Sequence, residues 1–267
     1  KTMFREAGIS YPVPGWTQAD FLETARKLVQ KDNNRTKVYG YAFDTFSDGF
    51  IDWLYVNGAN LINDEANRSA LHEPEAIAVL EFLQGMVREG IAPEPSLTAT
   101  FSNASGAFKS QRAAMYVTTV GWANSFAQDP NLDWDVVPLP TWTRDSKPAT
   151  RLWVNYWALP KGSPQAEEAF KVMAFFAGPK GQEIVGEQRM GIPGIPEIAY
   201  GSSFAGLPGA PAHKEYFLDV MDWAIPFPLF PQSDQFFTVM KREFDQMWTC
   251  ERSVEEAVKA LDRATLP

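Results

Sequence analysis

The stretch of this sequence best suited to ligand chemistry runs from Arg151 to Ser163 and reads Arg-Leu-Trp-Val-Asn-Tyr-Trp-Ala-Leu-Pro-Lys-Gly-Ser. In an extended backbone, side chains alternate, so Trp153, Asn155 and Trp157 share one face. Tyr156 then lies on the opposite face. Indole rings stack on the apolar faces of sugar rings, and a polar side chain between them can hydrogen-bond to hydroxyl groups. The pattern predicts that one face of this run is core and that the other lines a cleft between two lobes.

The sequence is rich in aromatic residues, with nine Trp, eight Tyr and nineteen Phe making up 13% of the chain. Large rings are the usual material of protein cores, so most of them are expected to be buried. Nine tryptophans still leave several that can face a ligand. Trp122 is one candidate, because Gly121 allows the backbone to approach closely and to present the indole ring.

Familiar catalytic motifs are missing from the sequence. It has no glycine-rich phosphate loop, no dinucleotide-binding glycine motif, no His-Glu-x-x-His and no Gly-x-Ser-x-Gly. His72 and His213, its two histidines, are far apart and belong to no recognisable constellation. Asp44 and Asp48 are possible glycosidase carboxylates, but thirty-three acidic residues make such near pairs common by chance.

Charge and composition limit the classes of partner. A formal charge of -9 argues against a nucleic-acid or anionic-membrane surface, because no basic excess is available to neutralise phosphates. Cys250 is the only cysteine, which excludes an internal disulfide and a cysteine-built metal site. No apolar run approaches the length of a membrane span, and residues 1–8 lack the apolar segment of a signal peptide. We expect a globular chain that uses no cofactor, either never exported or already freed of its signal.

Local signals place short strands and capped helices in alternation. Short apolar runs bounded by turns predict strands over 38–43, 113–118 and 135–140. Helix start signals lie at Thr17 with Asp20, at Pro74, at Ser163 with Pro164, at Pro179, and at Ser253 with Glu256. Two further helices are predicted from apolar spacing, one with Phe50, Trp53 and Leu54, the other with Phe236, Met240, Phe244 and Met247. This alternation indicates an α/β fold.

Several separated stretches resemble, in order, the segments of one protein family. The likeness is to "NK-x-LF-x-EAG … P-x-TW-x-EF", "F-x-x-GKAAM" with Gly-x-Trp, "a-PLP", "w-a-I-P-K-G-S", "s-P-E-x-Q" and "S-v-e-e-A-L", found here at residues 1–21, 107–122, 137–140, 157–163, 178–182 and 253–257. These segments are similar to those of the extracellular solute-binding proteins of bacterial ABC sugar importers, the class that includes maltose-binding protein. No single motif is specific, and the resemblance rests on their order and spacing.

The resemblance implies the periplasmic-binding-protein-like two-lobe α/β fold (type II). Family members carry a further segment before the first matching stretch, which forms most of the N-terminal lobe. The chain is therefore expected to hold the C-terminal lobe plus a short part of the N-terminal lobe. The implied parts are the C-terminal lobe in 1–152, a hinge crossing in 153–157, a returning N-terminal-lobe segment in 158–188 and closing helices in 189–267.

The resemblance also implies a function and a set of ligand contacts. A mono- or oligosaccharide would bind in an aromatic-lined cleft and be passed to the membrane permease subunits of an importer. The expected contacts are Trp122, Trp153, Asn155, Tyr156, Asp44, Arg189 and Trp53. For three of them a structural role is the alternative: a core ring for Trp122, a surface ion pair for Arg189 and a seal beneath its helix for Trp53.

Two other functions stay open at this point. One is a glycoside-active enzyme with the same cleft, and the other is a binder of a non-sugar solute such as a glycerophosphodiester, which needs clustered Arg or Lys. The sequence shows no obvious cluster of that kind. The resemblance further implies a monomer, no catalytic residues and a periplasmic or extracellular location, with a lipid anchor possible in a segment outside this sequence.

Overall fold

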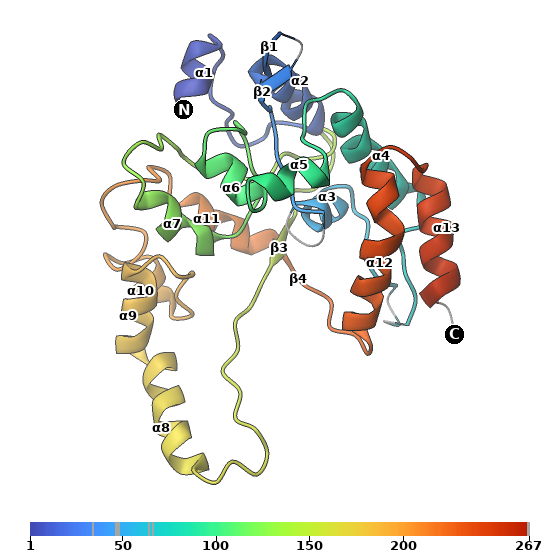
Figure 1. Ribbon diagram of the computed structural model, residues 1–267. Coiled ribbons are helices and arrows are strands. Elements are labelled where there is room, and N and C mark those ends of the chain that lie inside the picture. The colour runs from blue at the N-terminus through green and yellow to red at the C-terminus, as the bar shows by residue number, and fades with distance from the viewer. Residues whose placement is uncertain (34, 46–48, 64, 66, 266–267) are drawn as a thin grey trace. The chain divides into compact units, whose positions relative to one another are not determined.

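The computed structural model of the protein divides into two compact units (Figure 1). It describes residues 1–33, 35–45, 49–63, 65 and 67–265, and of Ser96 the backbone alone. Unit 1 comprises Lys1–Thr118, Leu139–Arg151 and Trp223–Pro267, and unit 2 comprises Thr119–Pro138 and Leu152–Asp222. The assignment of stretches to the lobes of the family fold stays a prediction.

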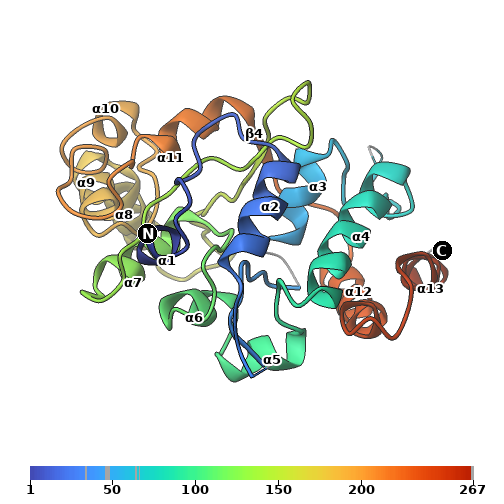
Figure 2. The same cartoon turned by 90° about the horizontal axis from the view of Figure 1, so that it is seen from above.

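Unit 1 is built mainly of helices. They are α1 (Thr2–Glu6), α2 (Gln18–Leu28), α3 (Phe50–Val56), α4 (Pro74–Arg88), α5 (Pro95–Thr100), α6 (Ala104–Lys109), α12 (Ser233–Trp248) and α13 (Val254–Thr265). Helix α4 lies beside α12 and α13, as Figure 2 shows from above. The Gln84 amide on α4 is buried and donates to the carbonyl oxygens of Met247 and Arg252, at 2.8 and 2.9 Å. One neutral side chain thus ties α4 to the turn between α12 and α13.

The strands are short and form two separate two-stranded pairs among the described residues. β1 (Gln30–Asp32) is antiparallel to β2 (Arg35–Val38), and β3 (Thr150–Leu152) pairs with β4 (Ala224–Pro226). The two strands predicted separately at 38–43 and 113–118 meet only in isolated parallel bridges, at Tyr39 with Ala113 and at Ala42 with Tyr116. The backbone N–H of Tyr39 donates to the Arg112 carbonyl at 2.8 Å, and that of Ala42 donates to the Met115 carbonyl at 3.0 Å. Both stretches are therefore extended and parallel without forming a continuous ladder.

Aromatic rings form the centre of the unit 1 core. Phe21, from α2, lies edge-on against Tyr41 and Trp53, with ring centroids 5.0 and 4.9 Å apart. The apolar stripe predicted on α12 is buried as expected, including Phe244 and Met247. Apolar side chains from distant parts of the sequence thus share a single core.

Unit 2 consists of shorter elements joined by long loops. They are η1 (Val120–Trp122), α7 (Ala123–Ala127), α8 (Ala166–Ala177), α9 (Pro179–Glu187), α10 (Pro196–Ala199) and α11 (Tyr216–Asp219), with η2 (Val220–Trp223) at its end. A small core of Ala199, Phe204 and Leu218 holds it together, with Val120 and Ile192 against it. The Gly- and Pro-rich stretch predicted as a loop therefore contains α10 and part of this core.

Three predicted boundaries in or near unit 2 are wrong. The extended run after Arg151 is a strand only as far as Leu152, because β4 offers just three residues to pair with it. Helix α8 begins at Ala166 with Gln165 as N-cap, not at Pro164, since Gln165 has φ -123° and ψ 43°, outside the helical region. The described residues contain no strand over 135–140, where two prolines lack the N–H that a ladder needs.

Candidate functional site

Trp122 is the outermost of three neighbouring aromatic rings in unit 2. Its half-buried ring stacks on Phe126, with centroids 6.1 Å apart and planes inclined by 19°. The buried Phe126 ring in turn meets Trp134 edge-on at 5.5 Å. The stack fixes the plane of the indole from beneath while leaving part of Trp122 accessible. This is the arrangement that a stacking platform needs.

Arg189 lies close in space to the turn that carries Trp122. A Cβ placed on Gly121 would lie 3.7 Å from the carbonyl oxygen of Met190, the residue after Arg189. The Arg189 backbone is in the left-handed region at φ 53°, and its Nη2 donates to the Pro208 carbonyl at 2.8 Å. Its recorded partner is thus a backbone carbonyl, not the carboxylate of a surface ion pair. The structure brings the Trp122 and Arg189 segments together.

A loop at 208–211 is held by two cations. Besides the bond from Arg189 to Pro208, the buried Lys214 Nζ donates to the carbonyl oxygens of Gly209 and Pro211, the latter at 2.5 Å. Burial, and after it the positive charge of Arg189, lowers the pKa of Lys214. Three carbonyls of this short loop therefore point toward positive charge, which fixes the loop against the Arg189 turn.

His213, two residues after this loop, pairs with the distant Asp135. His213 Nδ1 is 2.9 Å from Asp135 Oδ2, and the His213 backbone N–H donates to Asp135 Oδ1 at 3.1 Å. Burial opposes the ionised carboxylate, but the hydrogen bonds from His213 prevail and hold the pKa of Asp135 below its usual value. The His213 ring also stacks on Tyr216 at 5.2 Å. The pair fastens the 135 and 213 segments of unit 2 to each other.

Asp44, in unit 1, accepts hydrogen bonds at both carboxylate oxygens. Oδ1 accepts from the backbone N–H of Ala104, the first residue of α6, at 3.1 Å, and Oδ2 accepts from the Tyr116 hydroxyl at 3.0 Å. A carboxylate has further lone pairs, so these bonds orient Asp44 without exhausting its capacity. Asp48, the other carboxylate of the glycosidase alternative, lies outside the described residues.

Trp53 has no contact with solvent. Its side chain is 0% exposed, and its indole N–H donates to the Tyr41 hydroxyl at 3.2 Å. Burial is the main cause that raises the pKa of Tyr41, which keeps this hydroxyl protonated. This position agrees with the structural alternative for Trp53, in which its ring packs beneath the helix that carries it and contacts no ligand.

Trp153, Asn155 and Tyr156 follow β3 and are exposed. Tyr156 is 75% and Trp153 51% exposed. They lie in an extended segment of unit 2 beyond the end of the strand, so the predicted alternation of faces is not imposed by a ladder.

Comparison with known proteins places the chain in a family. The sequence profile of the bacterial extracellular solute-binding proteins matches residues 1–183. The chain belongs to this family. A comparison with curated protein sequences gives no match.

Solved structures share the fold of this solute-binding protein. An ABC substrate-binding protein of Listeria monocytogenes in complex with cycloalternan is 22% identical, with a TM-score of 0.83 over 98% of this chain and 66% of its own. A solute-binding protein of Thermotoga lettingae bound with α-D-tagatose is 21% identical, with a TM-score of 0.78 over 99% of this chain and 67% of its own. The maltose/maltodextrin-binding domain of Bdellovibrio bacteriovorus bound to maltotriose is 14% identical, with a TM-score of 0.77 over 96% and 67%.

These likenesses confirm the predicted fold class. The chain spans 66% of the length of the Listeria protein, so it corresponds to about two thirds of such a structure. Among the described residues, no helix combines the length and apolar character that a membrane crossing requires. The same residues contain no group of three or more His, Cys, Asp or Glu side chains placed to hold a metal ion.

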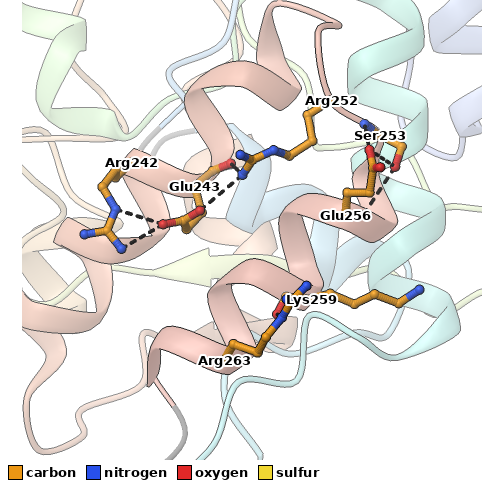
Figure 3. Close-up of polar contacts among 7 residues, drawn as sticks. All are labelled: Arg242, Glu243, Arg252, Ser253, Glu256, Lys259 and Arg263. Carbon is orange, nitrogen blue, oxygen red and sulfur yellow. Dashed lines mark hydrogen bonds and ion pairs between the residues drawn. The ribbon is translucent and has the colours of Figure 1, made fainter.

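Two hollows in unit 1 are separate from the predicted contacts of this solute-binding protein. One, of about 470 Å³, is lined by Thr36, Tyr39, Val87, Gly90, Ala92, Glu94, Leu97 and Thr100. The other, of about 620 Å³, lies on α13 and the turn before it, and is lined by Glu251, Arg252, Glu256, Ala260 and Arg263. Figure 3 shows that two side chains of the second hollow are held by polar contacts: Arg252 with Glu243, which also pairs with Arg242, and Glu256 with Ser253. None of the predicted ligand contacts lines either hollow.

Sequence reasoning missed Lys214 and the pairing of Asp135 with His213. Lys214 is an isolated lysine beside a Gly- and Pro-rich loop, and nothing in the local pattern indicates that it is buried. The only available signal was the density of Gly and Pro at 191–211, since the carbonyls of a loop that forms no regular structure need donors from elsewhere.

Proposed function

We propose that this solute-binding protein binds a carbohydrate and delivers it to a bacterial ABC importer. The observation that carries the proposal is the half-buried Trp122 ring, held flat on Phe126 beside the Arg189 turn, in a chain of this family. An indole supported from beneath offers its free side to the C–H face of a sugar ring. Cycloalternan, α-D-tagatose and maltotriose, each bound by a structural neighbour, define the range of sugars to test.

The proposed contacts combine apolar stacking surfaces with polar hydrogen-bonding groups. Trp122 supplies the stacking surface, Trp153 and Tyr156 add ring contacts, and Asn155, Asp44 and Arg189 hydrogen-bond to hydroxyl groups. We leave Trp53 out of this set, because its ring is fully enclosed. A ligand bound between two lobes shifts the protein toward the closed form, by an amount set by the difference between its affinities for the closed and open forms. Binding of this kind makes or breaks no covalent bond.

The remaining parts of the proposal follow from the family. The partners are the membrane permease subunits of the importer, the protein is a monomer, and it acts in the periplasm or at the cell exterior, with or without a lipid anchor. It has no enzymatic activity and no cofactor.

The structure brings two cationic side chains close together, as a phosphate ligand would require, but both already donate hydrogen bonds to backbone carbonyls. Arg189 and Lys214 donate to three carbonyls of the loop at 208–211. Lys214 is buried and already donates to two of these carbonyls, so the pair offers a phosphodiester no cluster of accessible cations. The cation pair therefore does not favour this alternative.

The test is a binding measurement with a substitution in the platform. Maltotriose, α-D-tagatose and cycloalternan are titrated by calorimetry and thermal shift, and we expect saturable stabilisation by at least one of them. Trp122→Ala should then weaken binding about tenfold or more, which corresponds to about 1.4 kcal/mol. Trp157→Ala, which removes an exposed ring outside the proposed contacts, is the matched control.

Two results would refute the proposal. Release of shorter sugars, followed by chromatography, would identify an enzyme. Unchanged affinity in Trp122→Ala, with a binding sugar found, would remove Trp122 from the site.

A further inference from the structure

Asp52 is a buried carboxylate of α3 that contacts two segments far apart in the sequence. It is the third residue of the helix, and its side chain is 7% exposed. Its Oδ2 accepts a hydrogen bond from the Gly49 backbone N–H at 3.1 Å, and its Oδ1 lies 3.7 Å from Arg151 Nε. The Arg151 side chain is 1% exposed. A single carboxylate thus joins the start of α3 to strand β3.

The ion pair of Asp52 and Arg151 lies in surroundings that do not favour charge. Tyr55, on the same helix, is buried, and this burial raises its pKa to about 12, with the positive charge of Arg151 opposing the rise and the carboxylate of Asp52 adding to it. Apolar residues of similar volume often stabilise a fold as well as a buried ion pair, because the pair loses its hydration. A buried pair can, however, fix one arrangement of the segments that it joins.

Arg151 stands directly before the run that carries three of the proposed ligand contacts. It is the middle residue of β3 (Thr150–Leu152), which pairs with β4. The strand ends at Leu152, and Trp153, Asn155 and Tyr156 follow it in the run that Figure 1 shows leaving β3. A strand of three residues forms few ladder hydrogen bonds. The hold of Asp52 on the Arg151 side chain therefore helps to fix the point at which the run begins.

Gly49 connects the same carboxylate to Asp44, another proposed contact. Gly49 and Asp44 form an isolated parallel bridge. The Gly49 backbone has φ 101°, and a Cβ placed there would lie 2.9 Å from the Cβ of Phe43, so this position requires glycine. The hydrogen bond to Asp52 holds Gly49 in this close approach. Asp52 thereby supports the backbone next to Asp44 as well.

We propose that Asp52 is a positioning residue of the carbohydrate site. Through Arg151 it fixes the start of the run that holds the contacts at 153–156, and through Gly49 it fixes the backbone at Asp44. Asp52 itself does not touch the sugar. The inference rests on the proposed function for its ligand, but the anchoring of the two segments is measurable without any sugar.

Two substitutions at Asp52 separate its two contacts in the sugar-free chain. Asp52→Asn keeps an oxygen for the Gly49 N–H and loses the charge that faces Arg151, whereas Asp52→Ala loses both. Amide hydrogen exchange over 151–156 should become faster in both variants, and exchange at Gly49 should become faster only in Asp52→Ala. Gln84→Met, which removes a buried polar side chain of the same unit that bonds to neither segment, is the control and should leave both rates unchanged.

The second measurement is the affinity for a sugar that the parent chain binds, taken by calorimetry below the unfolding transition of every variant. Asp52→Asn should raise Kd about tenfold, because contacts that are held less accurately bind less well. Arg151→Lys keeps a cation opposite Asp52, so it should raise Kd less than Arg151→Met does. Gln84→Met should change Kd by no more than about twofold, since it acts at a separate place.

A double variant distinguishes positioning from simple stabilisation. Asp52→Asn alone leaves the Arg151 charge buried without the Asp52 carboxylate, which destabilises a folded chain. Asp52→Asn combined with Arg151→Met removes both charges and should fold as well as the parent. It should nevertheless show the weaker sugar binding and the faster exchange over 151–156, because the link between α3 and β3 is still missing.

The possible failures are distinguishable. Recovery of the parent's affinity and exchange rates in the double variant would overturn the inference, since Asp52 would then act on stability alone. Equal losses in Gln84→Met would overturn it for the same reason. A parent chain that binds none of the sugars would refute the proposed function, and the exchange rates over 151–156 in Asp52→Asn would still decide whether Asp52 anchors the run.

Discussion

Helices α8 and α12 have similar sequence patterns and opposite surroundings. Each repeats large apolar residues at helical spacing, and the sequence predicts a helix at both positions. Helix α12 buries Phe236, Phe237, Met240, Phe244, Met247 and Trp248, whereas α8 buries no residue. The difference lies in the neighbours: α12 lies against α13 and α4, whereas α8 has its main contacts with α9. Periodicity therefore predicts a helix and the side that seeks burial, but the presence of a neighbour decides whether burial occurs.

The strongest test of this contrast removes one phenylalanine from each helix. Phe244→Ala in α12 should lower the free energy of unfolding by about 3–5 kcal/mol, because its ring is 1% exposed and leaves a cavity. Phe170→Ala in α8 should change it by no more than about 0.5 kcal/mol. Urea unfolding followed by circular dichroism measures both. Equal losses would mean that α8 is enclosed within this chain.

A second pair of substitutions asks how tightly α8 is held at its C-terminal end. A Cβ on Gly181 would lie 2.4 Å from the Phe175 carbonyl oxygen, so Gly181→Ala should destabilise the protein by about 1–3 kcal/mol. Gly85, inside α4, has nothing within 4 Å of the added atom. Gly85→Ala should therefore stabilise the protein by about 0.5–1 kcal/mol. Thermal melts distinguish the opposite signs, and a neutral Gly181→Ala would contradict a close α8–α9 junction.

Two buried side chains each donate to two backbone carbonyls, neutral Gln84 in unit 1 and Lys214 in unit 2. Replacing either by Met should cost about 1 kcal/mol or more, because buried carbonyls lose their donors. Of the two side chains, only Lys214 should make the free energy of unfolding depend on pH. Its pKa is lowered in the folded chain, so the unfolded chain binds more protons at pH values between that lowered value and its ordinary pKa of about 10.5.

Stability should accordingly rise with pH across that window in the parent and in Gln84→Met, and this increment should be missing in Lys214→Met. Urea unfolding at several pH values between 7 and 10.5 measures the difference. An identical pH profile in Lys214→Met would show that the lysine is not buried as described.

The smallest expected difference concerns ion pairs. Arg252 and Glu243, partly buried and linked further to Arg242 (Figure 3), form a network, and the hydrogen bonds from Arg242 are the main cause that lowers the pKa of Glu243. Arg252→Gln should cost about 0.5–1 kcal/mol, whereas Lys171→Gln, which breaks the exposed pair with Glu168, should cost about 0.5 kcal/mol or less. Added salt should reduce the first loss only slightly. A larger loss in Lys171→Gln would reverse the comparison.

The sequence by itself determined the features that depend on residues close along the chain. The capping boxes of Thr17 with Asp20 and of Ser253 with Glu256 are present, because each needs only groups three positions apart. Helix α4 begins at Pro74, as predicted. The α/β fold class and the family also followed from the order of local motifs.

The tertiary structure decided what depends on distant neighbours. Trp53 and Trp122 are both tryptophans near a glycine, yet one is sealed under Phe21 and Tyr41 and the other retains an accessible side. The strand after Arg151 ends early because β4 is short, and Lys214 is buried where it donates to the carbonyls of a loop that is itself not helical. Burial, strand pairing and charge compensation are interactions between segments. Residue types therefore limit the local structures and contacts that each segment can form, and its neighbours in the folded chain decide which of them it forms.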